Sequence, residues 1–174
     1  MKALPLVGRP ITVRFCAGLR AHRGKLLDAS DLRGIEVHAA SFVRRREIVF
    51  DSALKEDFRE YARVFVHELF HFTWVKLGNG LRRDFENVLE AEMRGGACGE
   101  LGWSAEMRKV KLVRADWARR TRAWREYACE SFCETGAWLY SGVVRHREFT
   151  LEGQFRRARR QWFERSGFRG RIPV

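Results

Sequence analysis

The order of hydrophobic and polar residues predicts a short run of strands followed by a longer run of helices. Residues 11–15 alternate between apolar and polar side chains, and residues 35–39 and 47–50 repeat this period of two. The glycine- and charge-rich segment 18–34 is expected to be a loop with a short helical turn. Strands first and helices afterwards indicate an α+β fold, with a small antiparallel or mixed sheet of about three strands followed by a mostly helical bundle.

Helical periodicity begins after the last of these strands. Asp51 and Ser52 are candidate N-cap residues for a helix that runs to about Leu77 and ends at Gly78. Further helices are expected over residues 84–94, after Ser104, over residues 116–140 and over residues 150–165. No internal repeat or low-complexity linker divides the 174 residues, of which 45% are hydrophobic. The sequence therefore predicts a single domain spanning residues 1–174.

The formal net charge of +12 reflects an excess of arginine that is spread along the chain. Its densest part is the expected last helix, which carries Arg156, Arg157, Arg159 and Arg160. A basic segment of this kind is either a solvated helix face or a contact surface for nucleic acid or an acidic partner. These four arginines are therefore candidate nucleic-acid contacts.

The cysteines and the hydropathy pattern bear on the cellular compartment. The four cysteines form no C-x-x-C pair, and Cys129 and Cys133, one helical turn apart, suit core packing better than a bridge. Residues 1–8 lack the apolar core of a signal peptide, and no apolar run approaches the ~20 residues of a membrane span. We expect a cytoplasmic, reduced protein that does not cross a membrane.

The candidate chemistry lies in the first long helix, at His67-Glu68-Leu69-Phe70-His71. Four residues make just over one helical turn, so both imidazoles leave the same face and can converge on one cation. Neutral imidazoles suit Zn²⁺, and Glu68, about 100° further round the helix, can hold a water bound to the metal. Such a carboxylate can take a proton from the water and pass it to a leaving amine.

The surrounding helix supports a metal at this motif. Apolar side chains point nearly all the way round residues 58–75, as in a buried helix, and buried polar groups need partners that a cation would supply. The H-E-x-x-H motif resembles that of the zincin zinc metallopeptidases, and the resemblance covers about residues 35–77 and 120–140. It implies a zincin-like fold with one Zn²⁺ per chain and a hydrolase acting on a peptide or protein substrate.

A catalytic zinc site usually has three protein ligands, and no third histidine follows His71 at the metzincin spacing. Glu130 and Glu134, one turn apart, resemble the E-x-x-x-D/E helix of the gluzincins, although the second acid here is Glu. By that resemblance Glu130 binds the metal and Glu134 hydrogen-bonds a ligand histidine. The residues alone leave the exchanged roles, or another ligand, open. Small side chains at Gly136 and Ala137 would let the two helices approach closely.

Other parts of the site are less defined by the sequence. Tyr127, Tyr140 and His146 are candidate donors to an oxyanion, whereas His22 and His38 are interpreted as bystanders. By resemblance, the strand nearest the motif helix can pair with an extended peptide. The alternative is a non-catalytic basic binding or regulatory module that retains a zincin core. An intact Glu68 argues against a purely structural zinc site, which needs no base.

Overall fold

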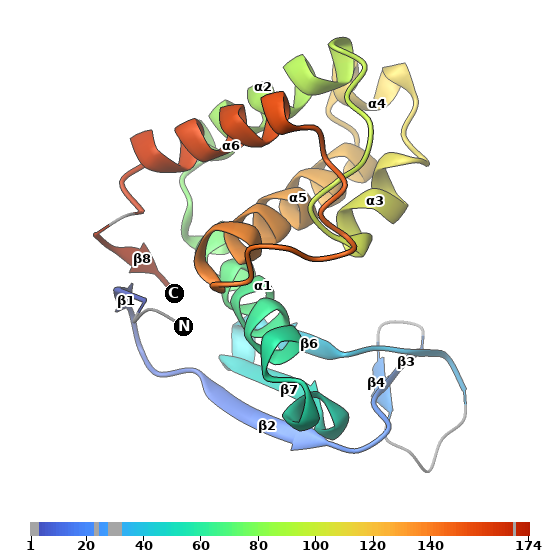
Figure 1. The fold of residues 1–174 in the computed structure, drawn as a ribbon, viewed down its shortest axis with the longest axis vertical. Helices are drawn as coiled ribbons and strands as arrows, with labels where there is room; N and C mark the ends of the chain where they lie inside the picture. The colour runs from blue at the N-terminus through green and yellow to red at the C-terminus, as the bar shows by residue number, and fades with distance from the viewer. Residues whose placement is uncertain (1–3, 23–24, 28–32, 169) are drawn as a thin grey trace.

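A mixed three-stranded sheet in the order β2-β7-β6 lies beside the first long helix (Figure 1). The computed structural model describes residues 4–22, 25–27, 33–168 and 170–174. The strands of this sheet are β2 (Thr12–Cys16), β6 (Ala39–Phe42) and β7 (Glu47–Asp51). Strand β7 pairs in parallel with β2 and antiparallel with β6. The α+β class and the small mixed sheet are thereby confirmed.

The segment between β2 and β6 forms a second sheet rather than a loop with a helical turn. Strands β3 (Arg20–His22), β4 (Lys25–Leu27) and β5 (Ile35–Glu36) pair antiparallel in the order β4-β3-β5. The prediction for residues 18–34 is wrong there, while residues 23–24 and 28–32 lie outside the described part. Arg20 donates to the Glu36 carboxylate and the Gly34 carbonyl, both at 2.9 Å. Because the residues in these contacts are far apart in the sequence, no pattern of neighbouring residues predicts the strands.

The expected strand over residues 35–39 is divided between the two sheets. Strand β5 ends at Glu36, and the chain then crosses to β7, where the His38 carbonyl accepts a hydrogen bond from the Asp51 amide at 2.8 Å. At the chain ends, β1 (Leu6–Val7) and β8 (Ile172–Pro173) form a parallel pair. Strand β1, near the start of the chain, therefore lies beside β8, near its end (Figure 1).

Two short 3₁₀ segments, η1 (Val43–Arg45) and η2 (Ser52–Glu56), flank β7. Helix α1 (Phe58–Lys76) begins after η2 because Asp57 caps it, accepting from two first-turn amides at 3.0 Å each. Of the two expected cap residues, Asp51 instead accepts from the Ala53 amide at 2.8 Å and caps η2, and Ser52 is the first residue of η2. The end of α1 before Leu77 agrees with the sequence prediction.

The remaining helices are α2 (Asn79–Arg94), α3 (Trp103–Lys109), α4 (Arg114–Arg119), α5 (Arg122–Tyr140) and α6 (Gly153–Arg165). The single helix expected over residues 116–140 is two helices, because Arg120 has a φ of 52° and Thr121 caps α5. Gly102, and not Ser104, is the N-cap residue of α3. No helix formed by the described residues has both the length and the apolar character needed to cross a bilayer.

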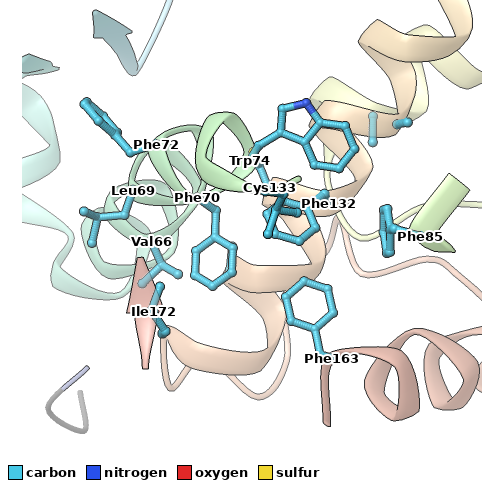
Figure 2. Close-up of a cluster of buried hydrophobic side chains, with 14 of the residues drawn as sticks. Val66, Leu69, Phe70, Phe72, Trp74, Phe85, Phe132, Cys133, Phe163 and Ile172 are labelled. Carbon is cyan, nitrogen blue, oxygen red and sulfur yellow. The ribbon is translucent and has the colours of Figure 1, made fainter. Parts of the chain in front are cut away.

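The core lies where α1 packs along α5 (Figures 1 and 2). The Phe132 ring lies 5.5 Å from Phe70 and 5.1 Å from Phe163, centroid to centroid. A Cβ atom on Gly136 would lie 2.4 Å from the Phe70 ring, so only glycine allows this approach of the helices. The expectation of a close contact at Gly136 is confirmed. This contact brings the motif of α1 beside the acidic residues of α5.

Candidate metal site

Helices α1 and α5 bring the motif residues and Glu130 into one cavity of about 270 Å³. Strand β6 forms one wall, and Ser104 at the start of α3 closes another part. The lining residues are Ala39, Ala40, Ser41, Val43, His67, Glu68, His71, Ser104 and Glu130. A site for a small ligand or ion is therefore built between the sheet and the two helices.

The two imidazoles point at each other across one helical turn. Their Nε2 atoms are 3.2 Å apart, and the Glu130 Oε2 atom lies 3.4 Å from the His67 Nε2 atom. Nitrogen and oxygen ligands on a tetrahedral zinc lie roughly 3.3 Å from each other, given bonds of about 2.0–2.1 Å. Nitrogen and carboxylate donors suit Zn²⁺, and both distances from the His67 Nε2 atom match the spacing of neighbouring ligands on this ion. The potential ligand atoms of His67, Glu68 and His71 all lie within 4.8 Å of one another, and Glu130 approaches this group beside His67.

The other ring nitrogen of His67 has a carboxylate partner. Its Nδ1 atom lies 3.3 Å from the Oε2 atom of Glu134, which is only 2% exposed. The Arg63 guanidinium lies 3.5 Å from the same oxygen. A Cβ atom on Gly102 would lie 1.9 Å from the Glu134 carboxyl carbon, so glycine leaves the space that this carboxylate occupies. A carboxylate thus lies behind the His67 ring, at the position from which carboxylates usually orient metal-binding imidazoles.

The His71 ring is approached by a thiol rather than a carboxylate. Its Nδ1 atom lies 3.6 Å from the Cys129 sulfur. The sequence did not predict this contact. Cys129 was expected to pack in the core, because its neighbours in the helix are apolar. Arg63 was missed as well, although its place one turn before His67 on the same face of α1 is a usable signal.

The electrostatics of the site favour positive charge on the two imidazoles. Burial lowers the pKa of His67, but Glu134 and Glu130 raise it by more, and this pKa stands well above its ordinary value. Burial also lowers the pKa of His71, while Cys129 and the charge of Glu130 raise it to about 9. Burial raises the pKa of Glu130, but the two histidines hold it well below its usual range. A metal cation that replaced the imidazole protons would meet the same negative surroundings.

Glu68 lies in the same cavity with a defined orientation. Its carboxylate accepts a hydrogen bond from the Ser41 hydroxyl of β6, and its side chain remains 7% exposed. A second cavity of about 400 Å³ adjoins this one and is lined by His67, Glu68 and Trp103 among others. His38, interpreted from sequence as a bystander, lines this second cavity.

The three candidate oxyanion donors do not line the cavity that holds His67 and His71. Tyr127 is fully buried, and its hydroxyl donates to Glu100 at 2.5 Å. The prediction that Tyr127 donates to an oxyanion is therefore wrong. The Tyr140 ring stacks on Phe70 in the core at 5.6 Å. The His146 Nε2 atom lies 3.2 Å from Glu60 and lines a different cavity. The tertiary structure thus gives these side chains other partners.

The four arginines of α6 do not form one basic surface. Arg159 is completely buried and donates to Glu92 and Glu100 at 2.7–2.9 Å, so its assignment as a nucleic-acid contact is wrong. Arg156 donates to the backbone carbonyls of residues 149 and 151. The Arg160 guanidinium lies over the Trp138 ring at 4.7 Å, and Arg157 is exposed. Three of these four arginines therefore make contacts within the protein.

The buried Glu100 carboxylate predicts a specific acid dependence of stability. Burial raises the pKa of Glu100, but Arg159 and Lys109 lower it by more, to below its ordinary value of 4.5. A carboxyl group with a lowered folded-state pKa stabilises the fold above about pH 4.5, and this contribution is lost as the pH falls through the folded-state pKa. The stability deficit of Glu100→Gln relative to wild type should therefore be largest near pH 7 and narrow in acid.

Urea unfolding across this pH range measures that deficit. The exposed Glu126, which pairs with Arg122 on the surface, provides the control, and Glu126→Gln should differ little from wild type at any pH. A deficit for Glu100→Gln that stays constant with pH would contradict the prediction.

The comparisons with known proteins found no similar protein. No protein-family model matches the chain, and neither the curated proteins nor the solved structures contain a match. The site must therefore be interpreted from its own residues.

Proposed function

We propose that this protein is a zinc-dependent metallopeptidase in which His67, His71 and Glu130 hold one Zn²⁺ per chain. The observation that supports this most directly is the pair of 3.2 and 3.4 Å spacings from the His67 Nε2 atom to the other two ligands. The Glu68 carboxylate stands beside these ligands in an accessible cavity, as a catalytic base requires. A purely structural zinc site would have no use for that carboxylate.

In this proposal the protein side chains position the reactants and move the proton. Bound zinc would lower the pKa of a coordinated water to about 7 and polarise the scissile carbonyl. Glu68, oriented by Ser41, would accept the proton of the attacking water and donate it to the leaving amine. Glu134 would fix the His67 ring, and Arg63 would hold Glu134 in place.

Strand β6 is the proposed docking edge for the substrate. It pairs with β7 on one side and lies at the end of the three-stranded sheet. Its residues Ala39, Ala40 and Ser41 line the cavity. An extended peptide that paired with this edge would be bound through its backbone, and its scissile bond would pass beside the motif. The four free cysteines are consistent with a reducing compartment, and we include a cytoplasmic location in the proposal on that basis.

Metal analysis tests the proposal first. The purified protein should contain about one Zn²⁺ per chain, and His67→Ala or His71→Ala should lose most of it because each removes a ligand. Elemental analysis after dialysis measures the content. His38→Ala, outside the ligand set, should retain the metal. A wild-type protein that stays free of zinc after reconstitution would exclude the proposed function.

The two glutamates of α5 should differ in the kind of effect they cause. Glu130→Gln replaces a charged oxygen ligand with a weak neutral one and should empty or loosen the site. Glu134→Gln retains all three ligands and weakens only the orientation of His67, which typically costs ~10–100-fold in metal affinity or activity. A competitive zinc titration compares the two variants. A larger loss of zinc affinity in Glu134→Gln than in Glu130→Gln would mean that Glu134 is the ligand and Glu130 the supporting residue. Negligible losses in both variants would mean that neither glutamate approaches the metal.

A further inference from the structure

A second group of potential metal ligands lies directly behind His71. The ligand atoms of His71, Cys129 and Cys133 all lie within 4.8 Å of one another. The two cysteines are one turn apart on α5, and His71 faces them from α1. The proposed peptidase chemistry uses neither thiol.

The spacing within this group suits a single cation. The His71 Nδ1 atom and the Cys129 sulfur are 3.6 Å apart. Bonds of about 2.05 Å to nitrogen and 2.3 Å to sulfur at tetrahedral angles put these two atoms roughly 3.6 Å apart. The helices would not have to move for both residues to bind the same ion.

The chemistry of the group selects a soft divalent cation. Cys133 is fully buried in the aromatic core between α1 and α5 (Figure 2), and Cys129 is half-buried. Two thiolates and one neutral imidazole neutralise a divalent charge, which reduces the cost of burying it. Thiolates favour soft cations over the hard ions that carboxylates and carbonyls bind.

We propose that His71, Cys129 and Cys133 form a binding site for a thiophilic divalent cation. A neutral imidazole has only one nitrogen free to act as a ligand. A cation on the Nδ1 atom of His71 keeps the proton on its Nε2 atom, the atom that faces His67. The site therefore competes with a metal at His67 for the same side chain. This competition rests on the proposed function, whereas the site itself does not.

A titration of the metal-free protein with Cd²⁺ alone tests the site. Thiolate-to-cadmium charge transfer absorbs in the ultraviolet, and wild type should develop this band and saturate it at about one Cd²⁺ per chain. Cys129→Ser and Cys133→Ala should each abolish the band. The double variant Cys16→Ser/Cys98→Ser removes the other two thiols and should retain it. Because Cys129 is only half-buried, Cys129→Ser decides the test if Cys133→Ala does not fold.

Two outcomes would overturn the site: an unchanged band in folded Cys129→Ser, or loss of the band in the Cys16→Ser/Cys98→Ser control. His67→Ala separates the site from the peptidase proposal, because this variant lacks one of the three proposed peptidase ligands and should still develop the cadmium band. In wild type, prior loading with Cd²⁺ should weaken zinc binding by ~10-fold or more, as expected when a ligand becomes unavailable. Zinc uptake with unchanged affinity beside an intact cadmium band would exclude the sharing of His71.

Discussion

The Glu68→Gln variant should bind zinc nearly as well as wild type and lose ~10²-fold or more of its peptidase rate. Glutamine has the size of glutamate but cannot accept the proton of the attacking water. Glu68 is not one of the three proposed ligands, so metal content should change little. The Ser41 hydroxyl donates to the Glu68 carboxylate. Ser41→Ala should therefore reduce the rate by a smaller factor, because the base remains and only its orientation is weakened.

Cleavage of a broad library of peptides, with zinc content measured on the same samples, is the appropriate assay. Glu56→Gln, at an exposed carboxylate just before α1, is the matched control and should cleave at the wild-type rate. Equal rates in wild type and Glu68→Gln would assign any observed cleavage to another site or to a contaminant.

The Arg159→Met variant should lose about 3–5 kcal/mol of folding stability. Its guanidinium is completely buried and donates to the carboxylates of Glu92 and Glu100. Methionine fills much of the same volume but leaves the buried Glu92 carboxylate without Arg159 and the buried Glu100 carboxylate with Lys109, 3.6 Å away. Removing one partner of a buried ion pair is far more costly than removing a surface charge. The loss should shrink as the pH falls, since protonated carboxyl groups no longer need a cation.

Chemical unfolding of Arg159→Met beside Arg157→Met measures this effect. Arg157 lies on the same helix but is exposed, so its replacement should change stability by less than about 1 kcal/mol. A similar small change in both variants would mean that the buried network contributes little to folding.

The local parts of the candidate site were predictable because helix geometry alone determines them. The spacing of His67 and His71 places both imidazoles on one face of any helix, and Glu130 and Glu134 repeat that spacing on a second helix. Alternation likewise predicts β2 and β7, whose side chains face opposite sides of the sheet in turn. These features depend on residues within a few positions of one another.

Features that join distant residues were not predictable from the same patterns. Strand β3 pairs with β5 through Arg20 and Glu36, and the local composition of this segment indicates only a loop. The density of arginines in the last helix suggested that Arg159 lies on a solvated face or contacts nucleic acid, because its partners Glu92 and Glu100 lie far away in the chain. A positive φ at Arg120 divides a pattern that is otherwise continuous over two helices.

The sequence by itself determined which side chains leave each helix together, since the α-helical period is a property of the backbone. Only the tertiary structure decided what those side chains meet. It places Glu134 behind His67 in a space that Gly102 leaves free, and it sets Cys129 beside His71. Both contacts depend on how closely α1 and α5 approach, and Gly136 against Phe70 allows that approach. The packing of the helices, and not the motif, defines the surroundings of the two histidines.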